Sequence, residues 1–199
     1  MSSTFDPVPV TLEGEAVRLE PLDSRHAADL FAAGRDEEIW RYMPRPAFCD
    51  AADVASWIAE TLQAAANGSE IPFAIVDRAS GRAAGSTRFL DIQRAHSSLE
   101  IGWTWLAKAH QRTRMNTECK YLLLRHAFED LGAIRVQLKT DGRNLQSQRA
   151  IERLGAVREG TLRKQRRLWD GYVRDTVYFS VLDDEWPLVK QRLEEFLAR

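Results

Sequence analysis

The sequence has little of what several specialised architectures require. Its 199 residues include only two cysteines, Cys49 and Cys119, and neither has the ligand spacing of a zinc site, so we expect no disulfide framework and no metal. No apolar stretch approaches the length that crosses a bilayer, and the N-terminus lacks a basic segment followed by an apolar core. We therefore expect an unprocessed cytoplasmic protein with no membrane partner.

An excess of charge of either sign is also missing. Lys and Arg total 28 against 29 for Asp and Glu, so nothing attracts the whole chain to nucleic acid, and any polyanion site must be local. The chain contains no linker, repeat or low-complexity block, and its 44% hydrophobic residues suffice for one core. We expect an N-terminal extension over residues 1–13 and a single domain over residues 14–199.

The apolar pattern predicts one α+β domain with the element order βαα-βββ-α-β-α-ββ-α. Strands are expected over residues 17–22, 72–77, 83–92, 97–106, 134–140, from 157, and over 173–182. Helices are expected after residue 24, over 50–67, from about 116 to 131, and over 145–154 and 186–197. Short turns make the three central strands an antiparallel meander.

The strand over residues 97–106 carries a candidate catalytic carboxylate. Its residues 99, 101, 103 and 105 are apolar and alternate with small or polar ones, so we expect Glu100 to point away from the face of Trp103 and Trp105. A carboxylate there could act as a general base. It could equally pair with Arg88 or Arg135 across the sheet, and both interpretations stay open.

A polar loop then leads from this strand into a helix. It reads Trp105-Leu-Ala-Lys-Ala-His-Gln-Arg-Thr-Arg-Met-Asn-Thr-Glu118, with Asn116 as a candidate cap. The first turn of a helix has unpaired N–H groups and the positive end of the dipole, so it can bind a pyrophosphate, with Arg112 and Arg114 as countercharges. An ordinary solvated connection also fits, and Glu118 would repel a phosphate unless it turns away.

This loop and a later segment together resemble the GNAT superfamily of N-acetyltransferases. The superfamily's pyrophosphate loop has Gln or Arg, two variable residues, Gly, one variable residue, then Gly or Ala; here Gln111 to Asn116 follow that spacing, with Arg114 and Asn116 at the glycine positions. The later segment, Asn144-Leu-Gln-Ser147 with a helix ending at Gly155-Ala156, is similar to the superfamily's Asn, two variable, Ser or Ala pattern. Ile151 stands where many members carry a Tyr general acid.

Ser147 without that Tyr is similar to the branch that acetylates the N-termini of ribosomal proteins, as are residues 17–22 and 40–44. The resemblance implies a mixed, twisted sheet of about seven strands flanked by helices, with a V-shaped split between the fourth and fifth strands for the pantetheine arm. It implies coenzyme contacts from the backbone of Trp105 and Leu106, from the Asn144 side chain, and from Gln111, Arg112, Thr113, Arg114, Met115, Asn116 and Thr117.

The resemblance also implies the chemistry. Acetyl-CoA would be the acyl-donor substrate, Glu100 the general base and Ser147 the donor of a proton to the coenzyme sulfur. The acceptor would be a primary amine, either a protein N-terminal α-amine or a small molecule, and the enzyme a homodimer. A catalytically weak acyl-CoA binding module and a transferase for a longer donor such as succinyl-CoA remain alternatives.

Two further features bear on the acceptor. The basic run Arg163-Lys-Gln-Arg-Arg167 could attract an acidic acceptor, although such a run also fits a solvated strand face. The only acidic residue on that strand is Glu159, so a base from this strand, as in the resembled branch, has weak support. Trp40 and Trp57 could line the acceptor side, where helices set specificity in the superfamily.

Overall fold

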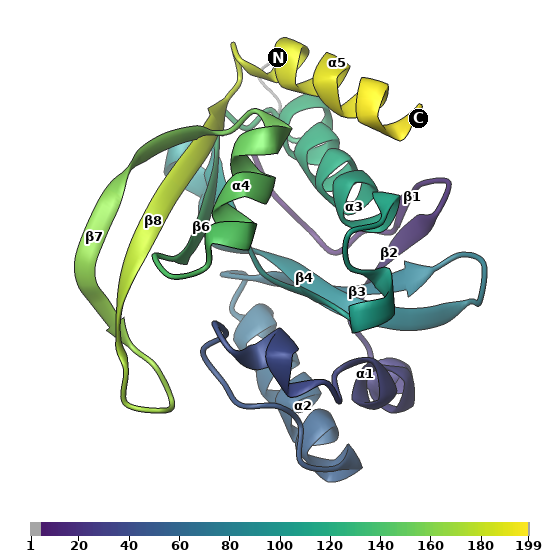
Figure 1. Ribbon diagram of the computed structural model, residues 1–199. Coiled ribbons are helices and arrows are strands. Elements are labelled where there is room, and N and C mark those ends of the chain that lie inside the picture. The colour runs from purple at the N-terminus through teal and green to yellow at the C-terminus, as the bar shows by residue number, and fades with distance from the viewer. Residues whose placement is uncertain (1–4, 199) are drawn as a thin grey trace.

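The computed structural model describes residues 5–198, in which one twisted sheet has helices on both faces (Figure 1). The described strands are β1 (Leu12–Glu13), β2 (Val17–Pro21), β3 (Ile71–Asp77), β4 (Arg82–Gln93), β5 (Ser98–Leu106), β6 (Arg135–Asp141), β7 (Val157–Arg167) and β8 (Val173–Leu182). The helices are α1 (Ala27–Ala33), α2 (Ala51–Ala66), α3 (Arg114–Arg125), α4 (Leu145–Leu154) and α5 (Trp186–Leu197). The α+β prediction is confirmed. No helix within residues 5–198 combines the length and the apolar character needed to span a membrane.

The strands lie in the order β1-β2-β3-β4-β5-β6-β8-β7. Neighbours are antiparallel except β5 and β6, which run parallel and pair only from Ser98 opposite Arg135 to Glu100 opposite Gln137. Beyond Glu100 these strands separate, which confirms the predicted split, since they are the fourth and fifth strands when the two-residue β1 is left out. β1 is the strand that sequence patterning missed, because two residues carry no detectable alternation.

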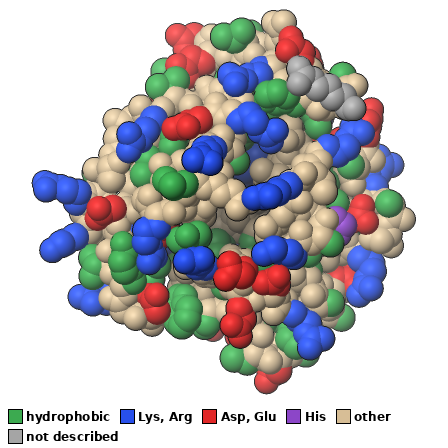
Figure 2. Space-filling model, viewed as in Figure 1, with side chains coloured by type: hydrophobic (Ala, Val, Ile, Leu, Met, Phe, Trp, Pro, Cys, Tyr) green, Lys and Arg blue, Asp and Glu red, His purple; other side chains and the backbone are tan. Residues whose placement is uncertain are grey.

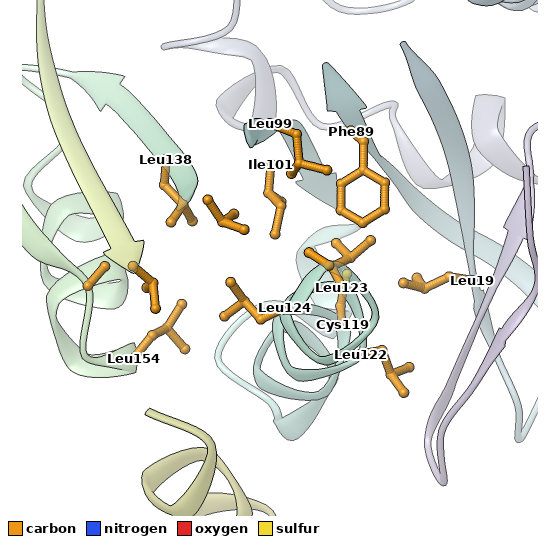
Figure 3. Packing of buried hydrophobic residues seen from close by; sticks show 14 of the residues in the cluster. Leu19, Phe89, Leu99, Ile101, Cys119, Leu122, Leu123, Leu124, Leu138 and Leu154 are labelled. Carbon is orange, nitrogen blue, oxygen red and sulfur yellow. The ribbon is translucent and has the colours of Figure 1, made fainter. Parts of the chain in front are cut away.

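Two apolar cores lie on opposite faces of the sheet. The larger core packs α3, α4 and α5 against the sheet, and Figure 3 shows Leu123 of α3 next to Phe89 of β4, with Ile101 and Leu99 of β5 close by. Phe5 and Leu12 belong to this core, so part of the predicted extension packs into the domain, whereas residues 1–4 lie outside the described range.

The smaller core lies under α1 and α2 and is aromatic. Trp40 and Trp105 have ring centroids 5.0 Å apart, and Phe48 and Trp57 pack around them. Trp40 and Trp57 are only 2% and 8% exposed, and neither lines the cavity described below. The expectation that they line the acceptor side is therefore wrong, because both are used to attach the helices to the sheet.

A bulge in β5 interrupts the predicted alternation. Trp103 has a φ of +51°, and β5 fits one extra residue between Gly102, opposite Arg88, and Trp105, opposite Ser86. Leu99 and Ile101 consequently face the larger core, whereas Trp105 joins the smaller core on the other face. The prediction of one continuous apolar face was thus wrong beyond Gly102, and the face away from Leu99 that carries Glu100 is also the face of Trp105.

Candidate active site

A cavity of about 740 Å³ opens where β5 and β6 separate. This volume lies within the range of about 300–1,000 Å³ typical of small-molecule sites. Its wall includes residues of α3 and α4 from one face of the sheet and residues 38–39 and 41–44 from the other. Figure 2 shows a hollow in the molecular surface with Lys and Arg side chains around its rim. Two substrates could therefore meet in this cavity from opposite faces of the sheet.

Glu100 lies where the pairing of β5 with β6 ends, and it lines the cavity. Its side chain is 2% exposed, its Oε2 lies 2.7 Å from Lys139 Nζ, and Gln137 Nε2 donates to the same oxygen at 3.0 Å. The two predicted alternative partners bind elsewhere, because Arg88 pairs with Glu70 and Arg135 with Glu159. The carboxylate is thus fixed in the cavity by neighbours on β6.

The Glu100 carboxylate occupies space that Gly102 leaves open. A Cβ built on Gly102 would lie 2.8 Å from Glu100 Oε1 and 2.9 Å from Leu90 Cδ2. Real Cβ atoms essentially never approach a neighbour so closely, so any larger residue would displace the carboxylate or Leu90. A glycine inside a strand often marks such a close approach, which is the sequence signal for this feature.

Asn144 and Ser147 lie together at the start of α4. Asn144 caps the helix, since its Oδ1 accepts a hydrogen bond from the Ser147 N–H at 3.0 Å. The Ser147 hydroxyl lines the cavity and has no hydrogen-bond partner among the described residues. The cap therefore leaves the Asn144 amide N–H groups and the Ser147 hydroxyl available to a ligand.

The predicted phosphate loop divides into residues that face the cavity and residues that do not. Gln111, Arg112, Thr113 and Asn116 line it. Thr113, rather than Asn116, caps α3, because its Oγ1 accepts a hydrogen bond from the Met115 N–H at 3.2 Å. The expectation of an Asn116 cap was wrong, since Thr113 and Asn116 are both good caps and sequence alone does not choose the turn at which a helix begins.

Three loop side chains point away from the cavity. Arg114 Nη2 donates to Glu15 Oε2 at 2.7 Å, and Met115 and Thr117 are 4% exposed within the fold. The left-handed backbone that glycine would favour occurs at Arg112, with a φ of +59°, and not at Arg114. Arg114 in the glycine position is therefore an ordinary helical residue, and its side chain adds no countercharge to the loop.

Glu118 turns away from the loop, as a phosphate site would require. Its carboxylate accepts hydrogen bonds from the backbone N–H groups of Glu15, Ala16 and Val17 at 2.7, 2.7 and 2.8 Å. These bonds fasten the turn between β1 and β2 to the first turns of α3. They also leave the N-terminal end of α3 without a competing negative charge near the cavity.

Trp105 and Leu106 lie on the edge of β5 that β6 no longer covers, and both line the cavity. The Trp105 ring is buried in the aromatic core, so its contribution to a ligand would come from the backbone. The Leu106 carbonyl already accepts a hydrogen bond from Gln111 Nε2 at 3.1 Å. An extended ligand amide could still pair with this free strand edge, as a strand added to a sheet does.

Lys120 of α3 is a cavity residue that the sequence did not indicate. It is 6% exposed, and its Nζ donates to Thr104 Oγ1 at 2.7 Å. Burial lowers the pKa of Lys120 to about 8, against opposing effects from Cys119 and Glu100. Lysine is rarely buried, so its position in the helical pattern gave no signal of this environment.

The exposed strand β7 supplies little to the cavity. Glu159 hydrogen-bonds Arg135 and Ser180, and the Arg135 guanidinium lowers the pKa of this carboxyl. It does not line the cavity, so the resembled branch's base on this strand has no counterpart here. Within the basic run, Arg166 reaches the cavity, whereas Arg163, Lys164 and Gln165 lie on the exposed surface.

Several known proteins are similar to this chain. Residues 16–157 match the family model described as an acetyltransferase (GNAT) domain. The crystal structure of a GCN5-related N-acetyltransferase from Brucella melitensis superimposes with a TM-score of 0.90 at 33% identity, over 96% of this chain and 87% of that one. An uncharacterized N-acetyltransferase, p20, from Bacillus licheniformis is 24% identical over 88% of this chain and 98% of its own length. The "Putative ribosomal N-acetyltransferase YdaF" of Bacillus subtilis (strain 168) is 30% identical over 53% and 57%, respectively.

Proposed function

Because the chain belongs to the GNAT acetyltransferase family, in which an acyl group leaves an acyl-CoA, we propose that it transfers an acetyl group from acetyl-CoA to a primary amine. The observation that supports this most is Glu100, a fixed carboxylate at the end of the β5–β6 pairing inside a cavity reached from both faces of the sheet. An amine acceptor needs such a group, because only a neutral amine attacks a thioester.

The donor would bind between α3 and α4. The start of α3 offers unpaired N–H groups beside Gln111, Arg112 and Thr113, and this end of the cavity is also lined by Arg149 and Arg153. The pyrophosphate would lie there and the pantetheine arm along the free edge of β5 next to Asn144 and Leu106. The chemistry of these residues fits a coenzyme that is anionic at one end and amide-bearing in its arm.

The transfer would be direct. Glu100, itself or through one water, would accept a proton from the amine while the nitrogen attacks the thioester carbonyl carbon. As the C–S bond breaks, the Ser147 hydroxyl would supply a proton to the sulfur and regain one from water, while Glu100 would release the amine's proton to water, and the amide would form without a covalent enzyme intermediate. Lys139 and Gln137 orient the Glu100 carboxylate for this role.

The proposed acceptor is a protein N-terminal α-amine or a small primary amine. An N-terminal acceptor is supported by the name of the B. subtilis relative, a putative ribosomal N-acetyltransferase. A homodimer is supported by Leu162 and Trp169, which are 53% and 55% exposed on the β7–β8 hairpin. A cytoplasmic location is supported by the two free cysteines. Sedimentation velocity tests the dimer.

Release of free thiol from acetyl-CoA over a panel of amines and short peptides tests the function. Turnover on any amine above the rate of hydrolysis supports the enzyme. Coenzyme binding by calorimetry without turnover on any amine would instead favour a binding module, and faster turnover with succinyl-CoA than with acetyl-CoA would favour the longer donor.

A further inference from the structure

We call the part of the cavity that is lined by residues 38–39 and 41–44 and by β6, β7 and β8 its acceptor end. It carries more positive charge than its own carboxylates neutralise. Each acidic residue that lines the cavity already has a cation: Glu38 pairs with Arg41 at 3.9 Å, Glu100 with Lys139 at 2.7 Å and Asp141 with Arg143 at 2.9 Å. Arg166 and Arg174 also line the cavity, and neither forms an ion pair with any residue that the structure describes. At the acceptor end, these two guanidinium groups therefore have no counterion among the described residues.

Arg174 is unusual because it is buried. It is 6% exposed, it lies on β8 directly opposite Arg166 on β7, and its Nε donates to Thr176 Oγ1 at 3.0 Å. No acceptor for its Nη groups is found within residues 5–198. Burial lowers the pKa of Arg174, and Arg166 lowers it further, whereas Asp141 and Glu100 raise it. An arginine stays protonated under these conditions, so the fold holds a largely buried cation directly opposite a second one.

The nearby acidic residues do not fill this role. Asp141 accepts hydrogen bonds from Arg143 Nε at 3.1 Å and Arg143 Nη2 at 2.9 Å, and Arg143 is held further by the Tyr172 ring, 3.4 Å from its Cζ. Asp141 is thus committed to Arg143. The Arg174 site is complementary to an anion from outside the chain, and a pair of guanidinium groups suits a carboxylate that accepts several hydrogen bonds.

We propose that Arg174 and Arg166 bind a carboxylate of a substrate, on the acceptor side of the cavity that Glu100 shares. The inference rests on the proposed function for the presence of an acyl acceptor in this cavity. The carboxylate could come from the acceptor amine or from the far end of a dicarboxylic acyl donor. Either source would place the same group against the same two arginines, and kinetics can separate them.

Direct binding tests the subsite without catalysis. Sodium succinate is titrated by NMR or calorimetry into the wild-type chain and into Arg174→Gln, Arg166→Gln and Arg163→Gln. Arg163 is the matched control, because it lies on the same strand but does not line the cavity. We expect Arg174→Gln to weaken succinate binding at least tenfold, Arg166→Gln to weaken it less, and Arg163→Gln to leave it unchanged.

Absence of succinate binding to the wild type, or equal binding to wild type and the Arg166→Gln and Arg174→Gln proteins, would overturn the proposal. Arg174→Lys covers the case in which Arg174→Gln fails to fold, because it keeps the charge but not the fork of donors. Arg166 is exposed on β7, so its variant should fold normally and by itself keeps the test decisive.

Kinetics identify the source of the carboxylate. Two peptides that differ only in a first residue of Glu or Gln are compared as acceptors with acetyl-CoA, and acetyl-CoA and succinyl-CoA are compared with the Gln peptide. If the wild type prefers the Glu peptide tenfold and Arg174→Gln removes this preference, the carboxylate belongs to the acceptor. If the wild type prefers succinyl-CoA over acetyl-CoA tenfold and Arg174→Gln removes this preference, the carboxylate belongs to the donor. Turnover with no preference in either arm overturns the subsite but leaves the proposed function standing. If no amine is acylated, the proposed function fails, and succinate binding still decides the subsite.

Discussion

Glu100 and Lys139 form an ion pair, with 2.7 Å between Oε2 and Nζ, immediately beside the point where β5 and β6 cease to pair. The lysine thus comes from the strand that diverges, and the carboxylate from the strand that the coenzyme would follow. Separation of these two strands creates the cavity, and the last paired residues fix the proposed base inside it. The position of the base therefore follows from the sheet register rather than from a flexible loop.

Gly102→Ala should impair catalysis while leaving the fold intact. The new methyl group would meet Glu100 Oε1 at 2.8 Å and Leu90 Cδ2 at 2.9 Å, so the carboxylate must move. We expect kcat to fall about tenfold, since small misplacements of a catalytic group are costly. Gly160→Ala on β7 is the control, because a Cβ there meets nothing within 4 Å. Equal kcat in the wild type and Gly102→Ala would mean that the position of Glu100 does not limit the reaction.

Ser147→Ala should slow turnover with little change in coenzyme affinity. Its hydroxyl has no hydrogen-bond partner among the described residues and the residue lines the cavity, so its loss should leave the fold intact and, in the proposed mechanism, remove the proton donor to the sulfur. Asn144→Ala is the contrasting variant. It should weaken coenzyme binding and, by removing the α4 cap, lower stability by about 1 kcal/mol. Steady-state kinetics with calorimetric coenzyme titrations check both, and unchanged rates in both variants would remove these assignments.

Glu118→Gln should destabilise the domain by about 2–3 kcal/mol, because three backbone N–H groups would share one neutral carbonyl oxygen instead of a carboxylate. Urea unfolding measures the change. Glu60→Gln on α2 is the control, since Glu60 is exposed. If both variants unfold like the wild type, the bonds between α3 and the β1–β2 turn contribute nothing measurable.

Lys120 should make stability depend on pH in the alkaline range. Its pKa is lowered by burial from 10.5 to about 8, so between these values the unfolded chain binds a proton that the folded chain has lost. Stability from this group therefore rises as pH increases from about 8, by at most about 1.4 kcal/mol per pH unit. Urea unfolding at pH 7, 8.5 and 10 should show this rise in the wild type relative to Lys120→Met. If the difference in unfolding free energy between the two proteins is the same at all three pH values, the pKa of Lys120 is not lowered by burial.

The features that the sequence predicted are those with local causes. The strand alternation around Glu100 and the helix after Asn144 follow from periodicity and capping chemistry. The bulge at Trp103 was not predicted, because residue type alone does not indicate that a non-glycine residue has a φ of +51°.

The features of the site that the sequence did not predict depend on contacts between residues far apart in the chain. Arg174 is buried only because β7 and β8 form a hairpin beside the cavity, and Lys120 only because α3 packs against Thr104. Arg114 looked like a countercharge for phosphate, yet it pairs with Glu15, 99 residues earlier in the chain. Such contacts depend on the assembled sheet, so neighbouring residues in the sequence could not indicate them.

The most direct test is the reaction rate of Glu100→Gln at saturating acetyl-CoA and amine, with coenzyme affinity measured in parallel. The account predicts that kcat falls at least about 100-fold, while the dissociation constant of acetyl-CoA stays within about twofold of the wild-type value. A Glu100→Gln protein that acetylates the same amine at the wild-type rate would contradict Glu100 as the base and, with it, the proposed geometry of transfer.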